Sequence, residues 1–328
     1  MPRAALHEYK SQRCVVTGGA GFIGSNVVRQ LLAAGAEVVV VDDFSVGKRE
    51  HLPAAPSLRV VDGDLGTIPE LAELLDGCDV VFHLAAQVGN VKSITWPESD
   101  AATNVLASVR LLHACSNARV RQVVYSSSSA IFGEAETLPI AEDHPQRPAS
   151  FYALSKLTAE RYALLAHALW QLPAVCLRYF NVYGLPLEDS EYSGVISIFL
   201  RRLLAGLPLV IYGDGRQVRD FVYVEDVARA NLLAGLHGRP GEVYNIGTGT
   251  ATSVLALAQT LREVAGSRAD VLHQPARAGE VARSVADVRK AAAALGYEPQ
   301  WQLRRGLEAL WSHVAGAATA EVDAASPR

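Results

Sequence analysis

The stretch CVVTGGAGFIG, residues Cys14–Gly24, joins a β-branched apolar run directly to a helical pattern and decides the fold. Gly18 permits a tight turn after the strand, Gly21 lets the backbone approach a pyrophosphate, and Gly24 lets helix and strand pack closely. The first turn of the helix offers free N–H groups and a positive dipole to phosphates. This order predicts a dinucleotide-binding site, with a glycine-rich loop that binds no ligand as the alternative. The expected cofactor contacts in the loop are Gly18, Gly21, Phe22, Ile23 and Gly24.

Acidic residues follow the next predicted strands. Asp42 lies 18 residues after Gly24 and is followed by Asp43. A carboxylate there accepts hydrogen bonds from the adenosine ribose hydroxyls and repels the additional phosphate of NADP, so we expect NAD. Solvated loop carboxylates are the alternative. After the third strand, Asp64 is expected to bind the adenine amino group, with Leu65 beside it.

Short apolar runs alternate with helical patterns through the first half of the chain. The runs are β-branched and do not alternate with polar residues, as expected for strands that helices cover on both faces. The alternation predicts an α/β fold with a doubly wound parallel sheet and right-handed crossovers. The expected strands are Cys14–Thr17, Glu37–Val41, Leu58–Asp62, Val80–Leu84, Gln122–Ser126 and Ala174–Arg178. The expected helices are Phe22–Ala34, Pro69–Leu75, Pro97–Asn117 and Phe151–Trp170.

After about Phe180, glycine and proline recur at shorter intervals. We predict an NAD-binding Rossmann domain over residues 1–180, to which some later segments return. Residues 181–315 are expected to form a smaller C-terminal α/β substrate-binding lobe that closes over the carboxyl edge of the sheet, and residues 316–328 a disordered tail. The helices expected in the second half are Val195–Ala205, Val224–Leu236, Ser253–Val264 and Leu303–Trp311.

Composition narrows the classes of partner. The net charge of −4 shows no basic excess, so no nucleic-acid partner is expected. The first ten residues lack an apolar core, and no apolar run approaches the roughly 18 residues of a membrane helix, so no membrane partner is expected. The cysteines form no C-x-x-C pair and lie at no metal-ligand spacing, which predicts buried free thiols in a reducing cytoplasm and no metal site. They are Cys14, Cys78, Cys115 and Cys176.

Tyr152 and Lys156 are four residues apart in a helical pattern and share one face. An ammonium beside a phenol, with an oxidised nicotinamide nearby, lowers the tyrosine pKa and makes a general base near neutral pH. The preceding strand ends in the serine run Ser126–Ser129, at the edge of the sheet where ligands bind, and a serine there can bind the same substrate oxygen. The alternatives are a solvated Tyr-x-x-x-Lys and serines that serve only a turn.

Together these motifs resemble the extended short-chain dehydrogenases, and specifically the NAD-dependent sugar-nucleotide epimerases and dehydratases, with UDP-hexose 4-epimerases the most similar. The resemblance extends from about Arg13 to Trp311. Its motifs are Thr17–Gly24, His83–Gln87, Tyr125–Gly133, Tyr152 with Lys156, Arg178–Gly184, Gly213–Gly215 and Arg219–Val222.

The resemblance assigns roles residue by residue. Ser128 matches the catalytic Ser/Thr, Tyr152 the base, and Lys156 its partner. The expected cofactor contacts outside the glycine loop and the acidic residues are Leu84, Ala85, Ala86, Asn104, Ser126, Tyr152, Lys156 and Tyr179. Arg219 and Arg277 match two arginines that clamp a diphosphate, which suits the fork of a guanidinium. The expected substrate contacts are Ser128, Asn181, Val195, Tyr212, Arg219, Arg277 and Ser284.

The residues after Ser128 bear on the reaction. Similar dehydratases carry Asp-Glu there and related decarboxylases carry Glu, whereas this chain has Ser129 and Ala130. The resemblance therefore implies oxidation and reduction at one carbon. Tyr152 removes the proton of the sugar 4-hydroxyl, hydride passes to NAD, the 4-keto sugar rotates, and hydride returns to the opposite face.

The position of Ser284 bears on the substrate. In similar epimerases a tyrosine at the matching position confines the enzyme to glucose and galactose, so the small serine predicts acceptance of UDP-GlcNAc and UDP-GalNAc as well as UDP-Glc and UDP-Gal. Phe132 stands where the family usually has tyrosine. A uronic-acid substrate, another nucleotide base, a dehydratase or decarboxylase activity, and a non-catalytic NAD-binding regulator remain alternatives.

The helices Pro97–Asn117 and Phe151–Trp170 carry apolar residues on more than one face. Proteins that this chain resembles pair these helices in a homodimer, which we therefore expect. Packing within one chain is the alternative explanation of the pattern.

Overall fold

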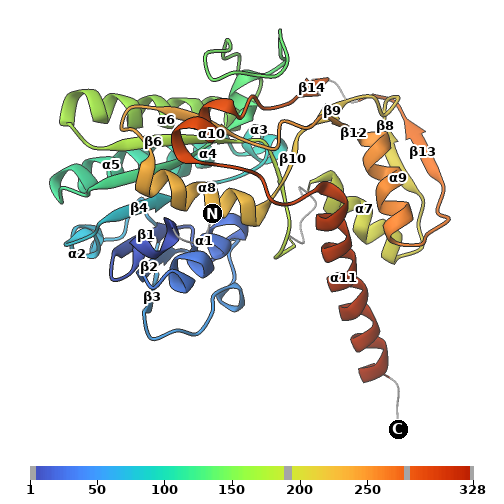
Figure 1. Cartoon of the computed structure of the whole chain (residues 1–328), viewed down its shortest axis with the longest axis horizontal. Coiled ribbons are helices and arrows are strands. Elements are labelled where there is room, and N and C mark those ends of the chain that lie inside the picture. The colour runs from blue at the N-terminus through green and yellow to red at the C-terminus, as the bar shows by residue number, and fades with distance from the viewer. Residues whose placement is uncertain (1–4, 188–193, 277–280, 326–328) are drawn as a thin grey trace.

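A computed structural model describes residues 5–187, 194–276 and 281–325 of the chain. A large layered α/β lobe and a smaller lobe lie beside each other (Figure 1). The predicted fold class is confirmed, because a parallel sheet covered by helices on both faces forms the centre of the large lobe.

In the described part of the chain, the central sheet has seven strands in the order β11-β6-β5-β4-β1-β2-β3, and each neighbouring pair is parallel. All six predicted strands are present, and β11 joins them from the second half of the chain. The strands are β1 Arg13–Thr17, β2 Glu37–Asp42, β3 Leu58–Asp62, β4 Val80–His83, β5 Gln122–Ser128, β6 Ala174–Tyr179 and β11 Val243–Ile246.

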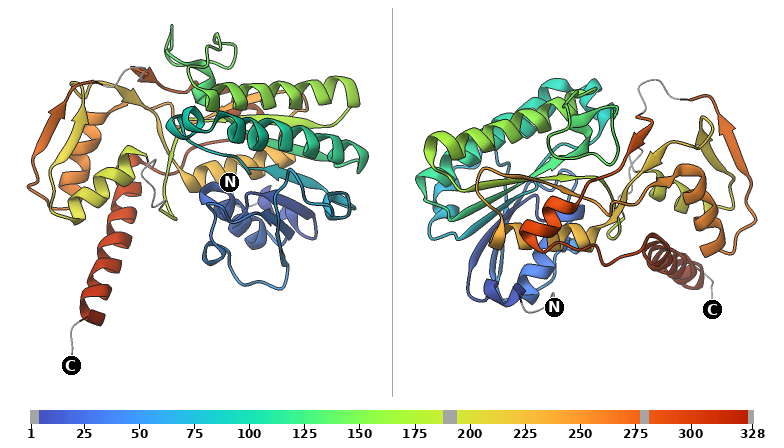
Figure 2. Two further views of the ribbon diagram at one scale, coloured as in Figure 1. Left: turned by 180° about the vertical axis from the view of Figure 1, so that it is seen from behind. Right: turned by 45° about the horizontal axis from the view of Figure 1, so that its top comes forward.

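Successive residues of these strands enter two different cores. Val16 of β1 packs with the buried face of α1 (Phe22–Ala33) and with α8 (Val224–His237). Its neighbour Val15 packs on the opposite face with α5 (Ala107–Asn117) and α6 (Phe151–Trp170). Figure 2 shows α5 and α6 side by side along that face. Because strand side chains alternate, the apolar run of each strand supplies both cores.

The segment expected as one helix over Pro97–Asn117 is interrupted in the structure. It consists of α4 (Pro97–Ala101), a π-helical turn η3 (Ala102–Leu106) and α5, and it follows a short helix α3 (Asn90–Thr95) that the sequence did not predict. A π turn is a local widening that often marks a functional position. The side chain of Asn104 in this turn binds Asp100 within the segment and Gln87 and Ser155 outside it, as described below.

The smaller lobe is built mainly from the second half of the chain. Its sheet pairs β8 (Leu209–Tyr212) with β13 (Val271–Gln274), and its apolar core includes residues of α7 (Val195–Leu204), α9 (Val254–Val264) and α11 (Leu303–Ala325). The helix α11 extends beyond the predicted end at Trp311, so residues 316–325 are helical in the structure. Residues 326–328 lie outside the described residues.

Short strands connect the two lobes (Figure 1). One pair is β7 (Asn181–Tyr183) with β10 (Phe221–Tyr223), and β9 (Val218–Arg219) lies between β12 (Thr252–Ser253) and β14 (Arg283–Ser284). The remaining helices are α2 Leu71–Leu75, α10 Arg289–Leu295, and the 3-10 turns η1 Ala5–Tyr9, η2 Arg49–His51 and η4 Ser129–Phe132. Among the described residues, no helix is both long and apolar enough to cross a membrane.

Candidate active site

The glycine loop between β1 and α1 is too closely packed for side chains. Gly18 has φ +67°, and a Cβ there would lie 2.6 Å from the backbone nitrogen of Ala85. A Cβ on Gly24 would overlap the carbonyl oxygen of Gly18. The N-cap of α1 is Gly21, whose backbone brings the helix terminus close to any phosphate without an intervening side chain. Gly18 and Gly24 thus have no room for a side chain, and the binding of a dinucleotide by this loop stays a prediction.

Asp42 ends β2 beside this loop. Its carboxylate is buried and accepts hydrogen bonds from the backbone nitrogens of Ala20 at 2.8 Å and Phe44 at 2.9 Å. Burial raises the pKa of Asp42, and the two N–H groups act in the opposite direction. Asp43 instead binds its own turn, accepting from the nitrogen of Ser45 at 2.9 Å. The two neighbouring carboxylates thus differ in their partners. Asp42 binds the glycine loop through Ala20, whereas Asp43 binds its own turn.

Asp64 lies further along the same edge of the sheet. It is exposed and accepts a hydrogen bond from the nitrogen of Gly66 at 2.7 Å, while Leu65 beside it is buried. The adenine contacts expected of these residues stay predictions.

A buried polar chain connects the glycine loop to the π turn. Ser108 Oγ donates to the carbonyl of Asn104 at 2.7 Å, so it accepts from His83 Nε2 at 2.8 Å. His83 Nδ1 is then the acceptor for Thr17 Oγ1 at 2.7 Å, and Thr17 in turn accepts from the nitrogen of Ala85 at 3.3 Å. Burial lowers the pKa of His83 to about 3, which agrees with this neutral tautomer. The sequence motif contained His83, but its role was not predicted.

The helix α6 begins at the carboxyl edge of the sheet, where β5 ends at Ser128. Ser150 is its N-cap and accepts a hydrogen bond from the nitrogen of Ala153 at 3.1 Å. Tyr152 is half-buried in the first turn, and Lys156 follows one turn later. The structure therefore brings the predicted base, its lysine and Ser128 to one edge of the sheet.

Lys156 lies almost entirely inside the protein. Its Nζ is 4.9 Å from the centre of the Tyr125 ring. Burial lowers the pKa of Lys156 to about 8, and the nearby carboxylate of Asp100 raises it. A buried ammonium on the same helix face as Tyr152 is the arrangement that the sequence predicted.

Asn104 holds the π turn against α6. Its Nδ2 donates to Asp100 Oδ1, to Ser155 Oγ and to the carbonyl of Gln87, each at 3.0 Å, and its Oδ1 accepts from the nitrogen of Gln87 at 2.8 Å. Ser155 immediately precedes Lys156. The predicted asparagine thus connects the π turn to α6, and a contact with the cofactor itself stays a prediction.

An ion pair that the sequence did not predict lies behind the serine run. Arg178 of β6 donates to Glu160 of α6 through Nη2 at 2.7 Å and Nε at 2.9 Å, and both side chains are at most 2% exposed. Ser127 Oγ also donates to Glu160, at 2.6 Å. Glu160 follows Lys156 by one further turn, so this pair fixes the rotation of α6 against β5 and β6.

Ser126 and Tyr179, both predicted cofactor contacts, bind each other inside the protein. Their hydroxyl oxygens are 2.9 Å apart, and Tyr179 Oη donates to Asn231 Oδ1 at 2.8 Å. Burial raises the pKa of Tyr179 well above its ordinary value. The predicted contacts Leu84, Ala85 and Ala86 directly follow β4, in the segment that packs on Gly18.

The predicted substrate residues come from several strands. Asn181 begins β7, and Arg219 ends β9 opposite Ser284 of β14 in the parallel register. These three therefore lie on adjoining segments at the junction of the lobes. Val195 begins α7 and Tyr212 ends β8 in the smaller lobe. Arg277 lies outside the described residues.

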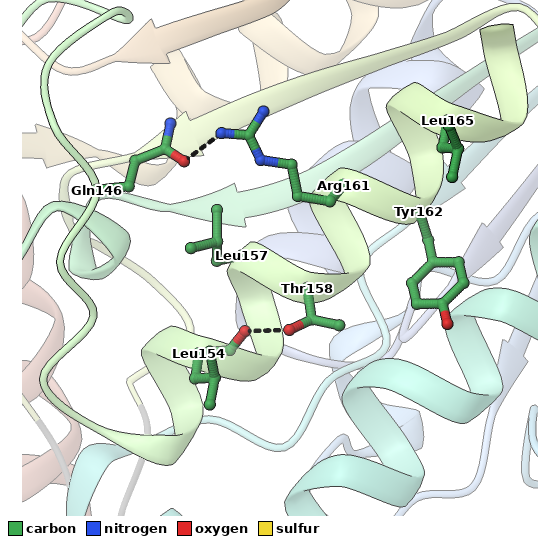
Figure 3. A pocket seen from close by; sticks show the side chains of 7 residues that line it. All are labelled: Gln146, Leu154, Leu157, Thr158, Arg161, Tyr162 and Leu165. Carbon is green, nitrogen blue, oxygen red and sulfur yellow. Dashed lines mark hydrogen bonds between the residues drawn. The ribbon is translucent and has the colours of Figure 1, made fainter.

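A separate shallow hollow of about 400 Å³ lies along α6, and neither Tyr152 nor Lys156 lines it (Figure 3). Arg161 crosses it and donates to Gln146 Oε1 at 2.6 Å. The residues that line the hollow are Gln146, Leu154, Leu157, Thr158, Arg161, Tyr162 and Leu165.

Comparisons with known proteins agree with this geometry. The profile of the NAD dependent epimerase/dehydratase family matches residues 14–247. A UDP-glucose 4-epimerase from Mycolicibacterium smegmatis is 38% identical over 304 residues, which cover 90% of this chain and 96% of the relative. A UDP-N-acetyl-alpha-D-glucosaminuronate decarboxylase from Bacillus cytotoxicus is 34% identical over 271 residues, 80% of this chain and 84% of that protein.

Solved structures show the same likeness. The UDP-glucose 4-epimerase from Thermotoga maritima with UDP-glucose is 36% identical, has a TM-score of 0.89, and is matched over 94% of this chain and 100% of its own. MoeE5 in complex with UDP-glucuronic acid and NAD is 40% identical with a TM-score of 0.83, over 92% of this chain and 99% of its own.

Proposed function

The chain belongs to the NAD dependent epimerase/dehydratase family, and we propose from this that it is a UDP-sugar 4-epimerase, an isomerase that acts through a transient 4-keto sugar. The observation that carries the proposal is the convergence of Ser128, Tyr152 and Lys156 at one edge of the sheet, with Ser129 and Ala130 in place of a further acid or base. The names of the relatives support the epimerase reaction.

NAD is the cofactor of this family, and the glycine cradle with Asp42 fits it. We assign the binding of NAD to residues 1–180 together with the segments that return to the sheet, and the binding of the sugar nucleotide to residues 181–315. Bound NAD supplies reversible hydride transfer at carbon 4 of the sugar.

The residues of the chain handle the proton. Tyr152 takes the proton of the 4-hydroxyl as the carbonyl forms and returns it when the hydroxyl is restored. The buried ammonium of Lys156 favours the phenolate, and Ser128 binds the same sugar oxygen. Because Arg178 and Glu160 hold α6 against the strand of Ser128, the two hydroxyls keep their relative position through both half-reactions.

The diphosphate anchors the substrate while the 4-keto sugar rotates in the site. We assign this anchor to Asn181 and Arg219, with Arg277 as the second arginine. Ser284 lies opposite Arg219, and we infer from its small side chain that the site admits an N-acetyl group on the sugar. UDP-GlcNAc and UDP-GalNAc are therefore proposed substrates together with UDP-Glc and UDP-Gal.

A UDP-uronic acid is the second candidate substrate. The structure of MoeE5 with UDP-glucuronic acid, at 40% identity, supports it, and a second structure of MoeE5 contains UDP-glucose. Decarboxylation is the alternative reaction, because one relative is a UDP-N-acetyl-alpha-D-glucosaminuronate decarboxylase.

The test is incubation of the purified protein with UDP-Glc, UDP-GlcNAc and UDP-glucuronic acid, followed by NMR and mass spectrometry of the products. Epimerisation at carbon 4 conserves mass, whereas dehydration or decarboxylation does not. Tyr152→Phe should abolish turnover while NAD remains bound. Tyr162→Phe, which removes the hydroxyl of an exposed tyrosine on the same helix, is the matched control. Unchanged turnover of Tyr152→Phe would disprove the assignment of the base.

We also propose that two copies pair through α6. Three of the side chains that line the hollow of Figure 3 are large, apolar and exposed. They are Leu154 at 49%, Tyr162 at 44% and Leu165 at 52% exposure. Leu165→Lys should convert a dimer to a monomer in size-exclusion chromatography with light scattering. Leu272→Lys, at a leucine 49% exposed on β13, is the control and should leave the mass unchanged. A wild-type monomer would refute the pairing.

A cytoplasmic location is proposed from the cysteines. All four thiols are free and buried, as suits a reducing compartment. Fractionation of cells that express the protein at its natural level tests this location.

A further inference from the structure

The carboxylate of Asp220 is fully buried directly beside Arg219. Among the described residues it accepts four hydrogen bonds. Oδ1 accepts from Thr248 N at 2.8 Å and Thr248 Oγ1 at 2.6 Å, and Oδ2 accepts from the nitrogens of Gly249 at 2.9 Å and Ala286 at 3.1 Å. Burial raises the pKa of Asp220, and these donors oppose the rise. The anion is thus stabilised by donors from two distant segments.

These contacts join the segments that carry the assigned substrate residues. The backbone carbonyl of Asp220 accepts from the nitrogen of Asn181 at 3.0 Å. Ala286, which donates to the carboxylate, follows Ser284 by two residues, and Ser284 is opposite Arg219 in the register of β14 and β9. Asp220 therefore touches, or directly adjoins, the backbone of each of these segments.

The surroundings of the carboxylate leave no free space. A Cβ on Gly247 would lie 2.5 Å from Asp220 Oδ2 and 2.8 Å from the Cβ of Ala286. The loop after β11 consequently packs directly on the carboxylate. Because protein interiors are closely packed, we expect a change in the donors or in the acceptor to shift the segments that meet at this carboxylate.

We propose that Asp220 is a positioning residue for the diphosphate site. Its carboxylate ties the segments of Arg219 and Ser284 to the loop of Thr248 through four accepted hydrogen bonds, and its backbone carbonyl accepts from the nitrogen of Asn181. The inference rests on the proposed function, because that function assigns the three residues to the sugar nucleotide. Asp220 itself is enclosed by the protein and does not contact the substrate.

Asp220→Asn tests this role at constant size. Its amide keeps one acceptor oxygen and places an NH₂ group against N–H donors. Asp226→Asn is the matched control, since Asp226 is also buried, pairs with Arg229, and accepts from the nitrogens of Gln300 at 2.9 Å and Trp301 at 3.0 Å. That control carboxylate holds a segment to which no substrate contact is assigned.

The readouts are bound NAD, kcat, KM for UDP-Glc and the Kd of UDP by calorimetry. Asp220→Asn should raise KM and the Kd of UDP roughly tenfold or more, as expected for a displaced charge-assisted contact, with bound NAD unchanged and kcat within about twofold. Asp226→Asn should alter stability without this increase in KM and Kd.

A milder pair covers the case in which Asp220→Asn does not fold. Thr248→Val removes the hydroxyl, which donates to Asp220 and accepts from the nitrogen of Thr250, and keeps the three backbone N–H donors to the carboxylate; Thr248→Ser restores the hydroxyl. Thr248→Val should weaken UDP binding and Thr248→Ser should recover it.

The outcomes separate the inference from the proposed function. If wild-type protein binds UDP and folded Asp220→Asn binds it equally well, the inference is overturned and the function stands. An equal loss of UDP affinity in Asp226→Asn also overturns it, because a general loss of stability would then explain the effect. Wild-type protein that neither binds UDP nor converts any UDP-sugar overturns both.

Discussion

Acidification tests the neutral imidazole of His83, which lies between Thr17 and Ser108 in the buried polar chain. Burial lowers the pKa of this side chain from its ordinary 6.5 to about 3. Because the folded-state pKa lies below the unfolded-state value, the unfolded chain binds a proton that the native protein excludes. The stability present above pH 6.5 is therefore lost progressively as the pH falls toward 3.

The magnitude follows from linkage. Within the window between the two pKa values, each pH unit changes the free energy of unfolding by up to about 1.4 kcal/mol. Between pH 6 and pH 5, His83 should lower the free energy of unfolding by about 1 kcal/mol, somewhat below the maximum because the unfolded imidazole is not yet fully protonated at pH 6. His83→Gln keeps a donor and an acceptor at this position and cannot be protonated, so it should lack this component.

The assay is urea unfolding of both proteins at pH 6 and pH 5, followed by circular dichroism at equal NAD content. The difference between wild type and His83→Gln should change by about 1 kcal/mol between the two pH values, because carboxylates contribute equally to both proteins. An identical pH dependence of the two proteins would refute the neutral, donor-to-acceptor arrangement of His83.

Three further predictions follow from packing and charge. Gly24→Ala should lose bound NAD and about 1–3 kcal/mol of stability, because its methyl group overlaps the carbonyl of Gly18. Gly316→Ala, where a Cβ meets open space, should keep both its NAD content and its stability. NAD content and urea unfolding are the two measurements. Glu160→Gln should lower the free energy of unfolding, measured in urea, by about 3–5 kcal/mol, because it leaves Arg178 buried without its counter-charge. Glu263→Gln, in the exposed pair with Arg304, should lower it by about 1 kcal/mol or less. Equal losses of stability in the two variants would contradict the argument from burial. Ser284→Tyr should abolish turnover of UDP-GlcNAc and retain that of UDP-Glc in the NMR assay, and retained turnover of both would remove this residue from the control of substrate size.

The central sheet and the helix α6 could be predicted because their signals are local. The β2 run Val38–Val41 is buried along its whole length, so its continuous apolar pattern needs no knowledge of neighbours. The bounds of α6, Phe151–Trp170, agree with the prediction because Ser150 caps its first turn and Gln171 ends it in a left-handed conformation.

The interruptions and networks could not be predicted because their causes are distant in sequence. The π turn at Asn104 depends on partners at Gln87 and Ser155. The pair of Arg178 with Glu160 joins two elements whose relative rotation is set by packing, and neither residue is unusual within its own window. The placement of Asn181, Arg219 and Ser284 followed from resemblance, and the role of Asp220 becomes visible only when four segments are seen together.

The late position of β11 has a consequence for synthesis on the ribosome. One edge of β6 stays open until residues Val243–Ile246 have emerged, long after β6 itself is complete at Tyr179. A nascent chain that stalls, or a fragment cut shortly after residue 180, would expose unpaired N–H and C=O groups along that edge and would be prone to self-association. To express the large lobe alone, the sequence of β11 must therefore be joined to it. Removal of everything after residue 180 would leave the central sheet without this strand.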